Sequence, residues 1–219
     1  MGIIKIKFFN IEFKSKSNFY FFIHHTRNIL AIVLLSLPLM SAAENTVIKS
    51  GDKAPYFKIK YLDRNDYVFF RDLQKVKNEG GLIIYDFFAT WCTPCKNEFP
   101  IFEKIYSDLA AKKILFYAIS IDAKHQDVWK FIKDDTKVTF PVLWDQNAFG
   151  AAKKYGADSV LPQLFIIDKE GIVRIIHVGE IKNLEAVLKS EIESLIPGTF
   201  PDYKNIKAEI GESAKKQSE

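Results

Sequence analysis

Apolar residues form long unbroken runs in the middle of the chain, and these runs predict buried strands. Residues 82–88 (LIIYDFF) are apolar except for Asp86, and residues 114–121 (ILFYAISI) are apolar except for one serine. Runs of this length are typical of strands that are buried on both faces of a parallel sheet. Residues 142–144, directly after Pro141, predict a third and shorter strand.

Two pairs of shorter apolar segments predict β-hairpins. Residues 56–61 alternate apolar and polar side chains, an Asp-Arg-Asn-Asp turn follows, and the apolar pattern resumes at 67–70. Residues 164–167 and 172–178 flank the turn sequence Asp-Lys-Glu-Gly. Polar turn residues between short apolar segments favour hairpins, and the glycine that ends the second turn tolerates positive φ.

Between the strands, apolar positions recur with the spacing of a helix. The helices predicted in this way are 94–111, 126–133, 148–155 and 184–196. Gly156 follows the third helix and Pro197 follows the fourth, where such residues end helices. Strands that alternate with helices, followed by a hairpin and a last helix, predict an α/β fold with a central mixed sheet flanked by helices.

The N-terminal region has the organisation of an export signal. Residues 29–40 (ILAIVLLSLPLM) follow several basic residues, and Ser41-Ala42-Ala43 supplies small side chains where a signal peptidase cleaves. We predict residues 1–43 to be a signal peptide, cleaved after its last alanine. A retained membrane anchor is the alternative, because a second apolar patch at 19–23 precedes the first.

Charge divides the chain in the same way. Residues 1–43 carry five Lys or Arg and one Glu, which accounts for the whole formal net charge of +4. Residues 44–200, the predicted folded domain, and 201–219, a polar and loosely held tail, are together neutral by count. The basic composition therefore gives no support for nucleic-acid binding.

The only two cysteines, Cys92 and Cys95, stand between strand 82–88 and the next helix. A helix N-terminus favours a thiolate over a thiol, and a second cysteine one turn later can attack a mixed disulfide formed by the first. A structural disulfide is the weaker interpretation, because so short a loop adds little stability. A zinc site is weaker still, since His125 and His177 lack the spacing to complete it. We expect neither a metal nor a cofactor.

Five sequence motifs point to a known family. They are Asp86–Ala89 with Trp91–Cys95, Gly51–Phe57, Cys95–Pro100, Phe140–Asp145 and Phe165–Gly171. Together they resemble the thioredoxin superfamily in its TlpA-like and ResA-like branch, over about residues 50–196. The resemblance implies a thioredoxin-like fold, here with an extra N-terminal β-hairpin.

The resemblance also implies roles for the cysteine motif. Cys92 would be the nucleophile and Cys95 the resolving thiol. Trp91 would shield the pair and offer an apolar contact to a partner protein. Pro94 would also belong to the substrate-binding surface, and it stands where reducing members of the superfamily usually have proline.

A proline later in the chain matches another feature of the superfamily. Pro162 corresponds to the proline that is cis and faces the disulfide, and the preceding Leu161 would hydrogen-bond an extended substrate strand. An ordinary trans loop proline is the alternative, since most X–Pro bonds are trans. The segment 155–162 lacks the usual G-x-P or T-x-P lead, which makes partner recognition here a departure from the family pattern.

Two carboxylates lie close to the cysteines in sequence. Asp86 interrupts an apolar strand, at the position of the buried acid of thioredoxin, and a desolvated Asp with a raised pKa could deprotonate Cys95. The alternative is an Asp hydrogen-bonded to structure at a strand end. Glu98, one turn beyond Cys95, could modulate the thiols, or could simply be a first-turn acid favoured by the helix dipole.

These features predict an exported thiol–disulfide oxidoreductase, most readily a reductase of protein disulfides in the periplasm. The family expectation adds a membrane thiol reductant as electron donor and a possible role in cytochrome c maturation. Alternatives are a disulfide oxidase or isomerase and a non-catalytic thioredoxin-like binding module. A peroxidase motif would need Pro at 85 and Thr or Ser at 89, where this chain has Tyr85 and Ala89.

Overall fold

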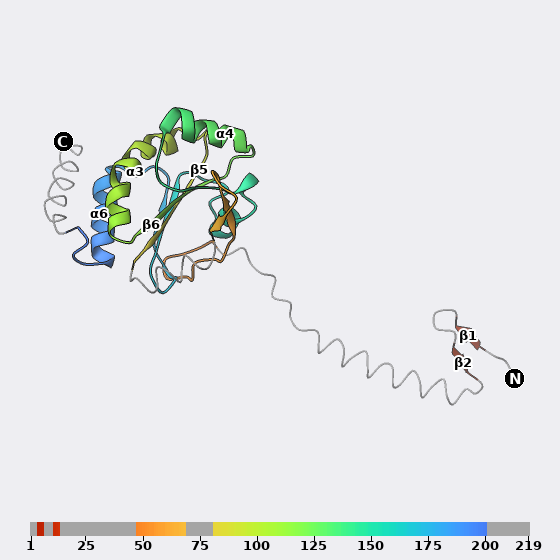
Figure 1. Cartoon of the computed structure of the whole chain (residues 1–219). Coiled ribbons are helices and arrows are strands. Elements are labelled where there is room, and N and C mark those ends of the chain that lie inside the picture. The colour runs from red at the N-terminus through yellow and green to blue at the C-terminus, as the bar shows by residue number, and fades with distance from the viewer. Residues whose placement is uncertain (1–3, 7–10, 14–46, 69–80, 201–219) are drawn as a thin grey trace, which may run out of the picture. The chain divides into compact units, whose positions relative to one another are not determined.

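The strand β5 (Ile83–Phe88) lies in the interior of the sheet, between β6 (Leu115–Ser120) and β8 (Gln163–Ile167) (Figure 1). The structure, a computed structural model, describes residues 4–6, 11–13, 47–68 and 81–200. Every residue of β5 is buried, and the strand pairs in parallel with β6 and antiparallel with β8. Burial on both faces and pairing on both edges explain why these sequences are almost uninterrupted apolar runs.

Within the described residues the main sheet has the order β4-β3-β7-β6-β5-β8-β9. β7 (Val142–Trp144) runs parallel to β6, and β9 (Val173–Val178) pairs antiparallel with β8. β3 (Ile59–Tyr61) and β4 (Tyr67–Val68) form an antiparallel hairpin at the opposite edge, next to β7. The predicted mixed sheet and both hairpins are confirmed, although the first strand begins at Ile59 and not at residue 56.

Two helices lie side by side on one face of the sheet (Figure 1). α3 (Thr93–Ala111) starts directly after Cys92, and α6 (Leu184–Leu195) packs along it. α4 (His125–Lys130) and the π-helical turn η1 (Phe131–Thr136) complete the cover of this face. These helices share one apolar cluster with the sheet, in which each fully buried large side chain contributes about 1.5–3 kcal/mol to stability.

The other face of the sheet is covered by α5 (Ala151–Tyr155) and by the chain around Phe57. Tyr155 is buried there, with its ring edge-to-face against Tyr85 and Phe165 at centroid distances of 5.8 and 4.9 Å. Such pairs add to the free energy of burial. Gly156 ends α5, as the sequence predicted, and does so in the left-handed conformation with φ of 72°.

Two of the predicted helices need correction. The helix predicted at 126–133 is α4 continued by η1, where the hydroxyl of Thr136 donates to the carbonyl of Phe131 at 3.0 Å. The helix predicted at 148–155 begins only at Ala151, because a separate 3₁₀ turn, η2 (Gln146–Ala148), precedes it. Both differences arise where side chains hydrogen-bond the backbone, which the apolar spacing does not reveal.

The N-terminal unit is described only in part. β1 (Ile4–Ile6) and β2 (Ile11–Phe13) pair antiparallel in a small sheet that the sequence did not predict. The predicted signal at 29–40 and the tail 201–219 lie outside the described residues. Among the residues that are described, no helix has the length and apolar character needed to cross a membrane.

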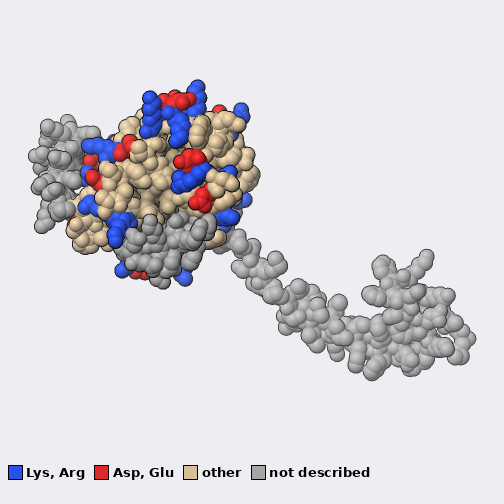
Figure 2. Space-filling model, viewed as in Figure 1, with Lys and Arg blue, Asp and Glu red and all other residues tan. Residues whose placement is uncertain are grey.

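The visible surface of the main domain carries charges of both signs. Figure 2 shows Lys and Arg interspersed with Asp and Glu on this face. A mixed surface of this kind does not create the extended positive field with which proteins attract nucleic acid.

Candidate active site

The cysteine pair lies at the junction of β5 and α3. Cys92 is the N-cap residue of α3, and its sulfur accepts the backbone N–H of Cys95 at 3.3 Å. The two residues form a disulfide, with Cα atoms 5.4 Å apart and 6% and 1% of the residue surfaces exposed. After reduction, the N-terminal end of this 19-residue helix would stabilise a thiolate at Cys92. The position of the pair therefore suits thiol–disulfide exchange.

A buried carboxylate fixes the loop that carries the cysteines. Asp122, at the end of β6, accepts the backbone N–H of Thr90 at 3.0 Å and its hydroxyl at 2.7 Å. Ser120 donates its hydroxyl to the same carboxylate at 2.8 Å. Sequence reasoning missed Asp122, although an acid directly after a buried strand was a signal that could have found it. Its bonds hold the approach to Trp91 and Cys92 in one conformation.

Asp86 is the second buried carboxylate near the cysteines. Side chains alternate along a strand, so Asp86 faces the α3 side together with Ile84 and Phe88. It is 1% exposed, and neither of its carboxylate oxygens has a hydrogen-bond partner within the part of the chain that the structure describes. Burial, with a smaller contribution from the negative charge of Glu98, raises the pKa of Asp86 well above its usual value. The alternative of an Asp hydrogen-bonded to structure is therefore wrong.

Glu98 lies one turn beyond Cys95 on the buried face of α3. It is 3% exposed, and its carboxylate accepts the backbone N–H of Ile181 at 3.3 Å. Burial raises the pKa of Glu98 to about 7. The hydrogen bond from Ile181 lowers this pKa, the negative charge of Glu180 raises it, and the charge of His177 lowers it. Since α3 begins at Thr93, Glu98 is not a first-turn acid, and that alternative is also wrong.

The raised pKa of Glu98 predicts a pH-dependent stability. Unfolded, Glu98 ionises near pH 4.5, whereas in the folded protein it stays protonated up to about pH 7. The folded state therefore binds the extra proton, and its stability falls by about 3 kcal/mol as the pH rises through this window. A glutamine at this position does not titrate, so Glu98→Gln should not lose this stability. The free energy of unfolding of the variant minus that of the wild type should therefore increase by about 3 kcal/mol from pH 4.5 to pH 7.5. Urea unfolding of both oxidised proteins across the window measures it, and parallel pH curves would contradict it.

The loop before β8 brings a cis peptide bond to the same end of the sheet. The bond between Leu161 and Pro162 is cis, as the resemblance implied. Gln163 pairs with Phe87, so the register sets Pro162 beside Phe88, at the end of the strand that leads to the cysteines. The side-chain amide of Gln163 donates to the carbonyls of Gly156 and Val160 at 3.1 and 3.0 Å, which ties down the loop before the proline.

Two more residues of the cysteine motif have distinct surroundings. Trp91 is 69% exposed, an unusual position for so large an apolar side chain. Pro94 occupies the first turn of α3, where its missing N–H leaves no hydrogen bond unmade.

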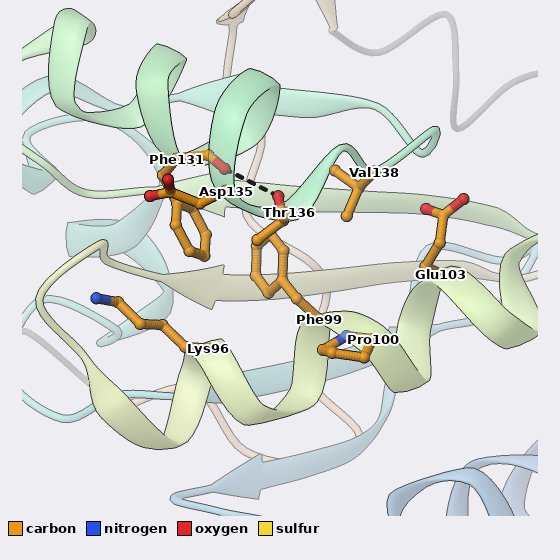
Figure 3. Close-up of a pocket in the computed structure, with 8 residues that line it drawn as sticks. All are labelled: Lys96, Phe99, Pro100, Glu103, Phe131, Asp135, Thr136 and Val138. Carbon is orange, nitrogen blue, oxygen red and sulfur yellow. Dashed lines mark hydrogen bonds between the residues drawn. The ribbon is translucent and has the colours of Figure 1, made fainter.

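A groove of about 510 Å³ runs beside the redox helix (Figure 3). It is lined by Lys96, Phe99, Pro100, Glu103, Phe131, Asp135, Thr136 and Val138, from α3, η1 and the residues after η1. Phe99 and Phe131 stack edge-to-face within it at a centroid distance of 5.1 Å. Neither cysteine lines this groove, so it borders the redox site without containing it.

Comparison with known proteins identifies the family. The family model described as AhpC/TSA matches residues 50–176, more than half of the chain and all of it from the G-x-x-A-P-x-F motif to β9. The chain belongs to the AhpC/TSA family. The chain does not have the peroxidase motif, because Tyr85 stands where that motif needs Pro and Ala89 stands where it needs Thr or Ser. Both residues are buried.

Named relatives of this AhpC/TSA protein carry thiol–disulfide chemistry. It is 29% identical over 170 residues to the thiol-disulfide oxidoreductase ResA of Oceanobacillus iheyensis, covering 78% of this chain and 86% of the relative. It is 30% identical over 148 residues to the thioredoxin-like protein YneN of Bacillus subtilis, covering 67% and 81%. A solved structure, a candidate thiol:disulfide interchange protein DsbE from Chlorobium tepidum, is similar with a TM-score of 0.58 and 29% identity, covering 68% and 98%. The AhpC/TSA protein is thus a thiol–disulfide oxidoreductase with a thioredoxin-like fold.

Proposed function

We propose that the protein reduces disulfides in partner proteins. The observation that carries this proposal is the buried carboxyl of Asp86, which has no hydrogen-bond partner among the described residues. It lies on the side of β5 whose neighbouring side chains, Ile84 and Phe88, share an apolar cluster with Cys92 and Cys95. A carboxyl kept in an apolar environment has a raised proton affinity, which suits it to take a proton from a thiol of high pKa. The step that needs such a base is the release of a reduced substrate by the second cysteine.

The reaction proceeds in two exchanges. The Cys92 thiolate attacks one sulfur of the substrate disulfide, so that a mixed disulfide forms and the other substrate sulfur leaves as a thiolate. Asp86 then accepts the proton of Cys95, and the Cys95 thiolate attacks the sulfur of Cys92. The substrate leaves as a dithiol, and its two-electron reduction is balanced by oxidation of the pair to the disulfide seen here.

The surrounding residues have supporting roles in this proposal. Trp91, exposed beside Cys92, provides an apolar contact for the partner. Pro94 lies in the first turn of α3, where a backbone N–H would have no partner inside the helix, so the proline costs no hydrogen bond there. Leu161 and the cis Pro162 position an extended strand of the substrate against the disulfide. Glu98 modulates the pair through its charge, because ionised Glu98 raises the proton affinity of Asp86.

The N-terminal sequence supports a proposal about the cellular setting. We propose that residues 1–43 direct export, either as a cleaved signal peptide or as a retained anchor, and that 44–200 act in the periplasm or an equivalent compartment. Because such a compartment oxidises thiols, a membrane thiol reductant would have to regenerate the reduced pair. The family expectation of a role in cytochrome c maturation makes apocytochrome c, with its haem-attachment cysteines, the partner protein to test first.

The reduction potential of the Cys92–Cys95 pair tests the proposed direction. We expect a value between about −270 and −180 mV, measured by equilibration of the protein with glutathione buffers and thiol alkylation. A value near −120 mV, the range of a strong oxidant, would contradict a reductase. Capture of partners with Cys95→Ala then separates the possible substrates, since apocytochrome c in mixed disulfide with Cys92 would support the maturation role.

A further inference from the structure

We infer that Phe149 forms a second contact site for the partner polypeptide, one that accepts an apolar side chain a few residues away from the partner's reacting cysteine. The inference rests on the proposed function, because it describes how the same substrate is held. Phe149 is 76% exposed, more than any other large apolar side chain in the described part of the chain. No sequence motif had singled it out.

Strand register places Phe149 at the end of the sheet that carries the cysteines. Phe88, the last residue of β5, pairs with Ser120 of β6, which pairs with Trp144 of β7. The N–H of Asp145 extends this register by donating to the carbonyl of Ser120 at 2.8 Å. Two strand spacings separate the ends of β5 and β7, which is about 10 Å and equals about three residues of an extended peptide.

The loop that carries Phe149 is held in a strained conformation. Asn147 and Ala148 both have positive φ, 56° and 58°, which costs energy in residues other than glycine. The carboxylate of Asp145 holds the loop by accepting the N–H of Gly150 at 2.7 Å and that of Ala152 at 2.8 Å. A Cβ at residue 150 would come within 2.6 Å of this carboxylate, so any larger residue would have to displace the Asp145 side chain. The buried carboxylate of Asp145 and the unfavourable backbone of residues 147 and 148 thus hold the loop in a conformation that leaves the Phe149 ring exposed to solvent.

Other exposed apolar side chains share this end of the sheet. Trp91 follows β5, Val160 precedes the cis Pro162, and Val178 ends β9 opposite Gln163; they are 69%, 47% and 62% exposed. Together with Phe149 they extend from β7 to β9 around the disulfide. Exposed apolar residues gathered around a reactive group mark an interaction surface, whereas single ones scattered over a protein do not.

The charge of this surface indicates what kind of segment it binds. The segments 89–94, 146–152 and 159–163 contain no Asp, Glu, Lys or Arg, although charged residues make up 26% of the chain. Two exposed acids, Asp158 and Glu180, each lie two residues from one of the exposed valines, so the uncharged part of this surface is the part around Trp91 and Phe149. Burial of a charged peptide residue against that part would be penalised. The occupant is therefore an extended, uncharged segment with an aliphatic or aromatic residue about three positions from the cysteine.

Model peptides test this inference directly. Two nine-residue peptides carry a central cysteine as its mixed disulfide with thionitrobenzoate; one has leucine three positions away on both sides, and the other has serine there. We expect the pre-reduced wild type to react with the leucine peptide in a single turnover with a second-order rate constant about 5- to 10-fold higher than with the serine peptide, and Phe149→Ser to lose most of this preference. The control is Val47→Ser, which also removes an exposed apolar side chain (70% exposed) but lies near Gly51, which hydrogen-bonds Val173 at the start of β9, away from the end of β9 at Val178. This variant should keep the preference for the leucine peptide.

The outcomes separate this inference from the proposed function. Equal leucine preference in Phe149→Ser and wild type, or no preference in wild type, would overturn the Phe149 site while the enzyme still reduces the serine peptide and glutathione disulfide. Absence of turnover with all of these disulfides would overturn the proposed function and the inference with it. Thermal unfolding of both variants verifies that they fold as the wild type does.

Discussion

Replacing Cys92 with serine is expected to lower the rate of disulfide reduction by about 10³-fold or more. Only a thiolate is an effective nucleophile toward a disulfide sulfur, and the N-cap position of α3 is what makes a thiolate available at neutral pH. A serine hydroxyl in the same place does not ionise at neutral pH and forms no disulfide. The measurement is turnover of a protein disulfide, with reduced substrate thiols counted by alkylation.

The matched variant is Cys95→Ser, which has the same change of atom one helical turn later. It should still react with a substrate disulfide but then stop at the mixed disulfide, because the resolving thiol is missing. A covalent Cys92–substrate complex should therefore accumulate in Cys95→Ser and be absent from Cys92→Ser. Full biological activity in Cys92→Ser would instead favour a non-catalytic binding module, and a trapped complex in neither variant would contradict the order of the two exchanges.

The parts of the fold that sequence predicted well depend on local pattern. β5 is specified by a nearly unbroken apolar run and α3 by apolar positions at helical spacing, and the cysteines stand between them. The buried strand, the redox helix and the place of the cysteines were therefore predictable together. The hairpin of β8 and β9 was likewise predictable, because Gly171 ends its turn with a φ of 77°. The burial of Asp86 followed from its place within an apolar run.

The parts that sequence reasoning missed depend on contacts between distant segments. Asp122 holds Thr90 across 32 residues, and nothing in either local sequence indicates the other. The anchoring of the Phe149 loop by Asp145 delays the start of α5 to Ala151, which the apolar spacing could not reveal. The role of Glu98 stayed open between a thiol modulator and a first-turn acid, because its hydrogen bond from Ile181, 83 residues later, cannot be predicted from the local sequence. Tertiary hydrogen bonds therefore decide the details that position the cysteines.

Replacing Asp86 with asparagine is expected to slow the second exchange by about 10²-fold at pH 7, the usual contribution of a general base. The substitution keeps the size of the side chain but removes the group that accepts the Cys95 proton. Pre-steady-state reduction of dithiobis(nitrobenzoate) resolves the two steps, since each exchange releases one coloured thiolate. The first release should be unchanged and the second slowed, with the deficit shrinking at alkaline pH as Cys95 ionises without help. An unchanged second release would contradict a base at Asp86.

The pH dependence of stability tests the protonation of Asp86 independently of its role in catalysis. Because burial raises the pKa of Asp86, the unfolded chain loses this proton at a lower pH than the folded protein does. Wild-type stability should therefore fall as the pH rises above about 4, the usual aspartate pKa, and Asp86→Asn should lack this part of the decline. Urea unfolding of the oxidised proteins, in which the cysteines do not titrate, isolates the effect. A functional base and a merely buried acid would both change the stability curve, but only the base would also slow the second exchange.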